Sequence, residues 1–259
     1  MRLTTNGKEL KEAITICRLR GKYNEGVSNA LSVLCDDIML QVHEGVLYVQ
    51  NADNYTYIVY RLECSESTNG IISISGSTLN KYLTDTDVTL ESNDSSVELT
   101  LNNSIVTIPL LERHSNSSVI TRLKEYLMKL DKLTASKIIR AGEKIQVTPK
   151  LFLSTILKLE SEEFVEAMSL AENVGNCIYK LDWSIENDSF LISSDRNNEE
   201  AVTEIEPISS TGDDATVEIS LPIGNIAKTE DVLIVAFNDD VPVVFINEKI
   251  TVLRGPRDR

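Results

Sequence analysis

Three pairs of adjacent aspartates are the residues whose type could bind a divalent cation or serve in acid–base chemistry. They are Asp36-Asp37, Asp213-Asp214 and Asp239-Asp240. Each pair falls where we expect a turn or the start of a strand. Aspartate is common at such places because its side chain hydrogen-bonds to nearby backbone. We therefore interpret the three pairs as local structural features and expect no metal site.

Residues for other kinds of catalysis are scarce in this chain of 259 residues. It has two histidines, His43 and His114, and four scattered cysteines without a CxxC pair. The patterns GxxxxGK[ST], GxGxxG and GxSxG, which would indicate phosphate binding, dinucleotide binding or a serine nucleophile, do not occur. We expect no enzyme activity and no cofactor.

The basic residues are the ones whose placement suggests ligand binding. The net charge is −15, yet 19 of the 25 basic residues lie in residues 1–22, 121–158 and 249–259. Such segregation indicates one cationic surface on an anionic body, although basic side chains on solvated helices would give a similar pattern. Aromatic residues make up only 5% of the chain and are not interleaved with the basic ones, which argues against stacking on single strands.

A helix that begins after Asn6 would position the first basic cluster. An apolar stripe with helical spacing is formed by Leu10, Ala13, Ile14 and Cys17. Three cations fall within about 80° of one another beside that stripe, namely Lys8, Lys11 and Arg18. One face of this helix can therefore pack on a sheet while a neighbouring face stays cationic.

The chain also repeats itself with a shift of 142 to 145 residues, as Ile72 and Val217 illustrate. Each copy is expected to follow the order β-α-β-β-β-β-α-β-β-β, with two helices against antiparallel strands, an α+β fold. We predict copy 1 over residues 1–110, a connector over 111–142 with a helix near Leu123–Leu133, and copy 2 over 143–259. In copy 2 the first helix is expected after Thr148, with Pro149 at its first position, and the second over 221–227.

Several stretches resemble one known family when they are taken in order. They are residues 2–13, 45–53 and 71–110 in copy 1, and residues 239–245 and 249–253 in copy 2. The set resembles the DNA polymerase sliding clamps, both the bacterial β clamp and proliferating-cell nuclear antigen, in a two-domain form that could be viral. The resemblance implies two tandem copies of the DNA-clamp domain that assemble into a ring, with helices inside and sheets outside.

The resemblance also implies a function. Six such domains close a ring, so two per chain imply a homotrimer with head-to-tail contacts through unpaired edge strands. The ring would encircle duplex DNA without reading its sequence and act as a processivity factor in DNA replication. The residues then expected to face DNA are Lys8, Lys11, Arg18, Arg20, Lys22, Lys81, Lys150, Lys158 and Lys228. The alternative is an acidic DNA mimic or protein-interaction module that does not encircle DNA.

The family's partners dock short peptides in an apolar groove, so a DNA polymerase and a clamp loader are the implied partners. The matching groove positions are Val42, His43, Leu110, Leu111, Pro242, Leu253, Gly255 and Pro256. The N-terminus has no apolar signal region and no apolar run is long enough to span a membrane. We therefore expect no membrane partner and no secretion. The expected location is cytoplasmic or nucleoid-associated, which means the host cytoplasm for a viral protein.

Overall fold

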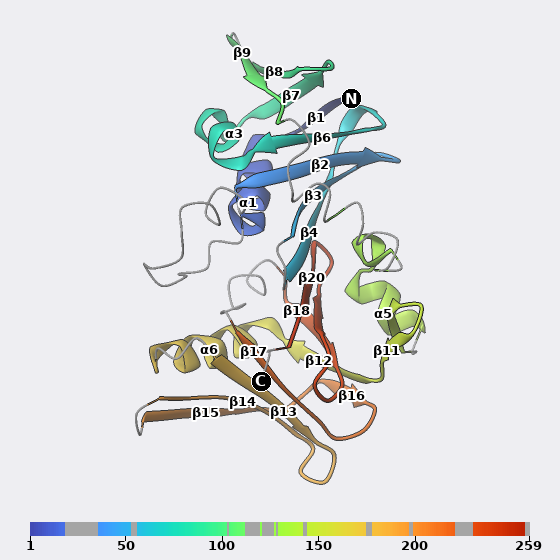
Figure 1. Ribbon diagram of the computed structural model, residues 1–259, viewed down its shortest axis with the longest axis vertical. Helices are drawn as coiled ribbons and strands as arrows, with labels where there is room; N and C mark the ends of the chain where they lie inside the picture. Colours follow the sequence, from blue (N-terminus) through green and yellow to red (C-terminus); the bar gives the residue numbers. More distant parts are fainter. Residues whose placement is uncertain are drawn as a thin grey trace. The chain divides into compact units, whose positions relative to one another are not determined.

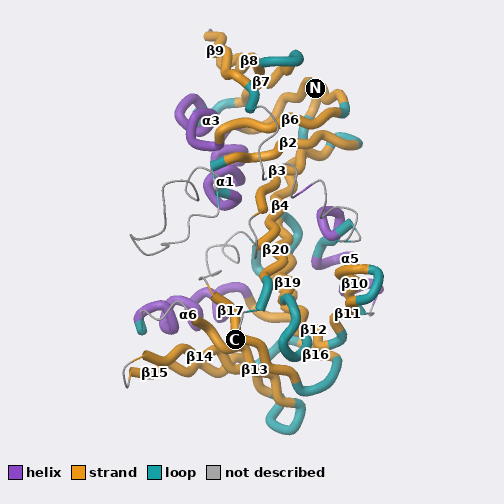
Figure 2. The backbone as a smooth tube through the Cα atoms, in the orientation of Figure 1, coloured by secondary structure: helices purple, strands orange, loops and turns teal. Residues whose placement is uncertain are grey.

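The computed structural model describes most of the chain as two compact units, Met1–Glu125 and Tyr126–Arg259 (Figures 1 and 2). The residues it describes are 1–18, 36–52, 56–102, 104–111, 120, 127, 129–141, 144–174, 178–196, 199–220 and 230–256. Within these ranges, no helix is both long and apolar enough to cross a membrane.

The first unit is built on two antiparallel sheets. One has the strand order β5-β1-β7-β8-β9, and the other contains β4-β3-β2-β6. Their bounds are β1 (Arg2–Asn6), β2 (Asp37–His43), β3 (Val46–Ala52), β4 (Thr56–Glu63), β5 (Ser65–Thr68), β6 (Gly70–Ser75), β7 (Asp87–Ser92), β8 (Ser96–Leu101) and β9 (Ser104–Pro109).

Alternation of apolar and polar residues accounts for the strands of this unit. Ile38, Leu40 and Val42 of β2 are all buried and lie on one face of the strand. The turn into β3 has positive φ angles at Glu44 (52°) and Gly45 (78°), the geometry of a tight hairpin whose twist matches that of its strands. The strands predicted from this alternation, and the closing strands near 88–110, are confirmed.

Two helices pack on these sheets, α1 (Gly7–Cys17) and α3 (Gly76–Tyr82). The Asn6 side chain accepts hydrogen bonds from the backbone N–H groups of Lys8 and Glu9, both at 3.1 Å, and so caps the start of α1. The predicted apolar stripe of α1 is fully buried. The helix predicted after Asn6 is therefore confirmed.

The second unit repeats this plan with a different opening. Its sheets contain β16-β12-β18-β19-β20 and β15-β14-β13-β17, and a separate hairpin pairs β10 with β11. The bounds are β10 (Ile145–Thr148), β11 (Leu151–Leu153), β12 (Thr155–Glu160), β13 (Ile178–Ser184), β14 (Ser189–Arg196), β15 (Glu199–Ile205), β16 (Ser209–Thr211), β17 (Ala215–Ser220), β18 (Val232–Phe237), β19 (Val243–Ile246) and β20 (Ile250–Arg254).

The helix predicted after Thr148 is wrong. Thr148 ends β10, and its hydroxyl oxygen accepts hydrogen bonds from the backbone N–H groups of Lys150 and Leu151. A threonine makes the same local contacts in a turn as at a helix start, and here the chain continues into β11. The first helix of the second copy is α6 (Ser161–Asn173).

Strand register identifies α6 as the counterpart of α1. Asn6 lies opposite Asp87 in the β1–β7 pair, just as Glu160 lies opposite Val232 in the β12–β18 pair. Each helix begins at the next residue. By this register β12 is the counterpart of β1, and the boundaries proposed for the two copies remain an interpretation of the sequence repeat.

The segment before β10 contains a 3-10 turn, η1 (Leu130–Lys132), and a short helix, α5 (Ala135–Ala141). The Glu248 carboxylate accepts a hydrogen bond from the backbone N–H of Ser136 at 2.6 Å and fixes the first turn of α5. The described part of the helix predicted at Leu123–Leu133 contains only η1, and α5 begins after it. The second helix predicted over 221–227 lies outside the described residues.

Candidate nucleic-acid interface

The first copy presents exposed cations on neighbouring helices. Lys8 and Lys11 lie on the solvent side of α1, Lys81 lies in the last turn of α3, and all three are exposed. The two helices contact each other. No carboxylate among the described residues forms an ion pair with any of the three lysines. Their charges are therefore available to an external anion.

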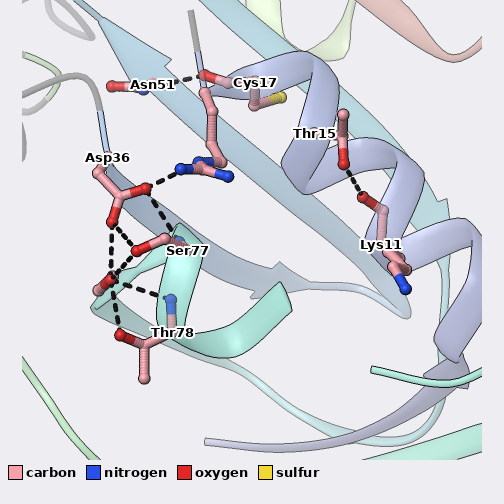
Figure 3. A network of polar contacts seen from close by, with 9 residues as sticks. Lys11, Thr15, Cys17, Asp36, Asn51, Ser77 and Thr78 are labelled. Carbon is pink, nitrogen blue, oxygen red and sulfur yellow. Dashed lines mark hydrogen bonds and ion pairs between the residues drawn. The ribbon is translucent and has the colours of Figure 1, made fainter. Parts of the chain in front are cut away.

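Asp36 holds the end of α1 against the start of α3 (Figure 3). Its carboxylate accepts hydrogen bonds from Ser75 Oγ at 2.7 Å, from Ser77 Oγ at 2.6 Å and from the Ser77 backbone N–H at 2.9 Å. Arg18 Nε lies 2.7 Å from the same carboxylate, at Oδ1. Because Ser75 is the N-cap of α3 and Arg18 follows α1, this network fixes the angle between the two helices.

Arg18 was predicted to face DNA, and the structure contradicts this prediction. Its side chain is only 12% exposed, and its guanidinium is paired with Asp36. The stem of the arginine packs on α3, since a Cβ atom at Gly76 would lie 3.1 Å from Arg18 Cγ. Arg18 therefore joins the helices that carry the exposed lysines.

Buried polar groups also fix the end of α1. Asn51 Nδ2 donates to the carbonyl oxygen of Cys17 at 2.9 Å, and Cys17 Sγ donates to the carbonyl oxygen of Val49 at 3.3 Å. The first contact satisfies a carbonyl that a helix end leaves without a partner. Burial raises the pKa of the Cys17 thiol, so this cysteine stays protonated and unreactive.

The Asp36 network makes stability depend on pH. Burial opposes ionisation of Asp36, but the hydrogen bonds from Ser77 and Ser75 and the charge of Arg18 outweigh it, so its pKa is lowered. A lowered carboxyl pKa contributes stability above the unfolded-state value of about 3.9, and this contribution is lost as the pH falls through the folded-state value. We expect Asp36→Asn to lower the free energy of unfolding by about 1–3 kcal/mol at neutral pH.

Urea unfolding of both proteins from neutral pH to acid is the measurement. The difference between wild type and Asp36→Asn should shrink as the pH falls below about 4. The exposed Asp85 lies in the turn after α3 and makes no hydrogen bond or ion pair with a described residue, so Asp85→Asn is the matched control. Equal stability of wild type and Asp36→Asn at neutral pH would contradict this account of the network.

The second copy does not repeat the cationic helix. Lys150 lies in the turn between β10 and β11, and Lys158 lies within β12, so the prediction that placed both with a helix is wrong. The helix of the second copy that corresponds to α1 is α6. It has no basic residue and carries four exposed glutamates, Glu162, Glu163, Glu166 and Glu172. Three further cations predicted to face DNA lie outside the described residues: Arg20, Lys22 and Lys228.

One aspartate of each adjacent pair accepts hydrogen bonds that hold local structure. Asp214 Oδ1 accepts a hydrogen bond from the Ile185 N–H at 2.6 Å, and Asp239 Oδ1 accepts one from the Thr216 N–H at 2.7 Å. Asp36 belongs to the network between the helices. Across the described ranges, no three histidine, cysteine, aspartate or glutamate side chains gather in a way that could hold a metal ion.

The predicted groove residues have different environments within their own units. In the first unit, Val42 is only 2% exposed, so it is a core residue and its prediction as a peptide contact is wrong. Leu110 and Leu111 follow β9 and are partly exposed, and the Leu111 N–H donates to the carbonyl oxygen of Ser73 at 3.0 Å. His43 ends β2 beside Glu44, with 3.6 Å between His43 Nε2 and Glu44 Oε1.

The groove residues of the second unit lie at the closing strands. Pro242 precedes β19. Leu253 lies in β20, opposite Val244 of β19, and Gly255 and Pro256 follow β20. All four are partly exposed. Whether the eight positions form one peptide groove stays a prediction.

No protein-family model matches the sequence, and no curated protein matches it either. Solved structures do match its fold. A DNA polymerase sliding clamp from Bacillus subtilis matches with a TM-score of 0.74 at 17% identity, over 100% of this chain and 64% of that one. A. fulgidus PCNA bound to the C-terminal region of FEN-1 matches with a TM-score of 0.67 at 15% identity. That match covers 100% of this chain and 98% of the other.

A chain of the PCNA2–PCNA3 complex from Sulfolobus tokodaii matches with a TM-score of 0.67 at 14% identity. The match covers 99% of this chain and 99% of that one. The chain thus spans about two thirds of the bacterial clamp and nearly the whole length of both PCNA chains. These likenesses show that the chain has the sliding-clamp fold, with helices on antiparallel sheets, as the sequence resemblance predicted.

Proposed function

We propose that this chain is a sliding clamp: three copies close into a ring around duplex DNA and hold a DNA polymerase on it. The observation that carries the proposal is the match of the fold over the entire chain to sliding clamps of both the bacterial and the PCNA type. Two copies of the clamp domain per chain then require three chains for a six-domain ring. The PCNA2–PCNA3 complex, in which two clamp chains bind each other, supports assembly between chains of this fold.

The edge strands β9 and β15 are the surfaces we propose for ring closure. Each lies at the end of its sheet, and each carries an exposed apolar residue, Ile105 at 68% and Val202 at 54%. Strand β9 contains no charged residue, although free edges are usually protected by charge. A groove of about 450 Å³ runs beside β15 and is lined by its residues and by Leu170 and Asn173 of α6.

In this proposal DNA meets the exposed lysines of α1 and α3. Duplex DNA carries about one charge per 1.7 Å of its axis, so lysines that are not placed to read bases still attract it. Such contacts hold the duplex without fixing a register, which suits a ring that must slide. Arg20, Lys22 and Lys228 remain part of the proposed surface.

Polymerase and clamp loader would dock through short peptides, as the FEN-1 C-terminal region does on the A. fulgidus clamp. The groove we propose for them uses Leu110, Leu111, Pro242, Leu253, Gly255 and Pro256, with His43 at its rim. Arg254 is 4% exposed and donates a hydrogen bond to Ser220 Oγ, so a truncation that spares the fold must begin at Gly255.

We expect Leu111→Asp combined with removal of residues 255–259 to reduce binding of a polymerase C-terminal peptide at least tenfold. A charge at position 111 and the loss of the tail remove the contacts that would bury the peptide's apolar anchors. Fluorescence anisotropy with a labelled peptide measures this. Phe152→Asp is the control, because Phe152 is also an exposed apolar residue, at 45%, on β11. Full affinity of the Leu111 variant would place the peptide site elsewhere.

The rival function is an acidic module that imitates DNA, and the carboxylates of α6 are the observation that favours it. The two functions differ in their dependence on DNA topology. A ring is retained on a duplex whose ends are both blocked and lost from the same duplex with an open end. A DNA mimic is retained on neither.

A further inference from the structure

Two helices in equivalent places carry different charges. Gly7, the first residue of α1, donates its N–H to the carbonyl oxygen of Thr86 at 3.1 Å, and Ser161 of α6 donates to that of Asp231 at 2.9 Å. Together with the strand register, this aligns Gly7 with Ser161. The buried stripes then coincide position by position, as Leu10 with Phe164 and Ile14 with Met168.

The same alignment compares the solvent faces. Glu162 stands where α1 has Lys8, and Val165 stands where α1 has Lys11. Glu163 and Glu166 align with Glu9 and Glu12, which are exposed glutamates of α1 as well. Glu172 aligns with Arg18, which is not an exposed cation because it is paired with Asp36. The two positions that hold exposed lysines in the first copy are therefore anionic or neutral in the second, and α6 has no cation to offset its glutamates.

Folding stability alone does not explain these carboxylates. Glu162 and Glu163 lie in the first turn of α6, where negative charge is favourable and where Glu160 provides no side-chain cap. Glu166 lies beyond that turn, where α1 also has a glutamate, Glu12. Glu172 lies in the last turn, where the helix dipole disfavours negative charge. Within the described part of the chain, none of the four forms an ion pair with a cation.

We propose that α6 is an anionic sector of the DNA channel, which repels the phosphate backbone and restricts DNA contact to the helices of the first copy. This inference rests on the proposed ring, in which three copies of α1 alternate with three copies of α6. The duplex then has three separated contact regions instead of a continuous cationic wall. Fewer phosphate contacts lower the salt dependence of binding and ease sliding.

The test transplants the α1 lysines onto α6 with Glu162→Lys and Val165→Lys. The control is Glu98→Lys with Thr100→Lys, the same change in charge on the exposed side of β8. A duplex is fixed to a bead at one end and carries biotin at the other, so that streptavidin can block the open end. Protein retained is measured over a series of salt concentrations, with and without the block.

The graft adds up to six phosphate contacts per trimer, and each steepens the slope of log affinity against log salt by about 0.9. We expect the slope to steepen by several units and the affinity at about 100 mM salt to rise at least tenfold. The control should stay within about twofold of wild type. If the graft impairs folding, Glu162→Gln with Glu166→Gln and Glu172→Gln must raise affinity in the same direction.

The outcomes separate the two proposals. Wild type that is retained only when the end is blocked, together with a graft that leaves affinity and slope unchanged, overturns the role of α6 and leaves the ring intact. A graft that weakens retention also overturns it. Wild type whose retention does not depend on the block overturns both the ring and the inference that rests on it.

Discussion

Ile105→Lys and Val202→Lys are each expected to convert the trimer into monomers, and an equimolar mixture of the two variants is expected to form dimers. Each substitution replaces the exposed apolar residue of its edge strand with a charge that strand pairing would bury, at a cost of at least about 3 kcal/mol, or more than a hundredfold in dissociation constant. The mixture retains one unaltered pair of edges, the β9 of the Val202 variant and the β15 of the Ile105 variant. A head-to-tail contact of that kind joins two chains and stops.

Native mass spectrometry reports the result directly. The wild-type trimer has three times the 28.8 kDa mass of the chain, about 86 kDa. Ile71→Lys is the control, because Ile71 on β6 is as exposed as Val202, at 54%, and should leave the trimer intact. A mixture that remains monomeric, or single variants that remain trimeric, would show that β9 and β15 do not form the contact.

Reversal of the two α1 lysines, Lys8→Glu with Lys11→Glu, is expected to remove most DNA retention and leave the ring assembled. A trimer loses up to six phosphate contacts and gains six carboxylates near the DNA. The slope of log affinity against log salt should become shallower by up to about 5, and affinity at about 100 mM salt should fall more than tenfold. Salt-dependent retention on duplex DNA and native mass of the same samples are the measurements.

The matched control reverses Lys129 and Lys144, which are also exposed but are not among the residues expected to face DNA. It changes the net charge by the same amount and should have a small effect. Equal losses in both variants would mean that net charge, not the α1 surface, controls DNA binding. Unchanged retention in the α1 variant would remove Lys8 and Lys11 from the interface.

Local patterns predicted much of the fold correctly. The alternation of Ile38, Leu40 and Val42 and the stripe from Leu10 to Cys17 each bury one face, and the structure confirms both. These signals lie within one element, so they do not depend on distant contacts. The sequence also contains the stripe of α6, with Phe164, Ala167, Met168 and Ala171 at helical spacing, and this signal locates the helix without distant contacts.

Other features depend on contacts between distant residues. A helix start and a turn use the same threonine contacts, so Thr148 and Pro149 could not show which of the two the chain forms. The pairing of Arg18 with Asp36 depends on how α1 and α3 pack, which composition and spacing do not reveal. The predicted DNA-facing set therefore combined exposed lysines with a structural arginine. The correspondence of α6 with α1, and so the contrast in their exposed charges, required the strand register that aligns the two copies.

Retention of wild-type protein on end-blocked DNA is the most direct test of the central claim, that this chain encircles duplex DNA. The bead-bound duplex is loaded through its open end, half of the sample is then blocked with streptavidin, and dissociation is followed at a salt concentration that abolishes ordinary electrostatic binding. We expect the protein to persist on the blocked duplex and to leave the open one rapidly, because a closed ring can escape only over an end. Equal dissociation from both duplexes would contradict encirclement and favour a protein that binds DNA from one side or does not bind it.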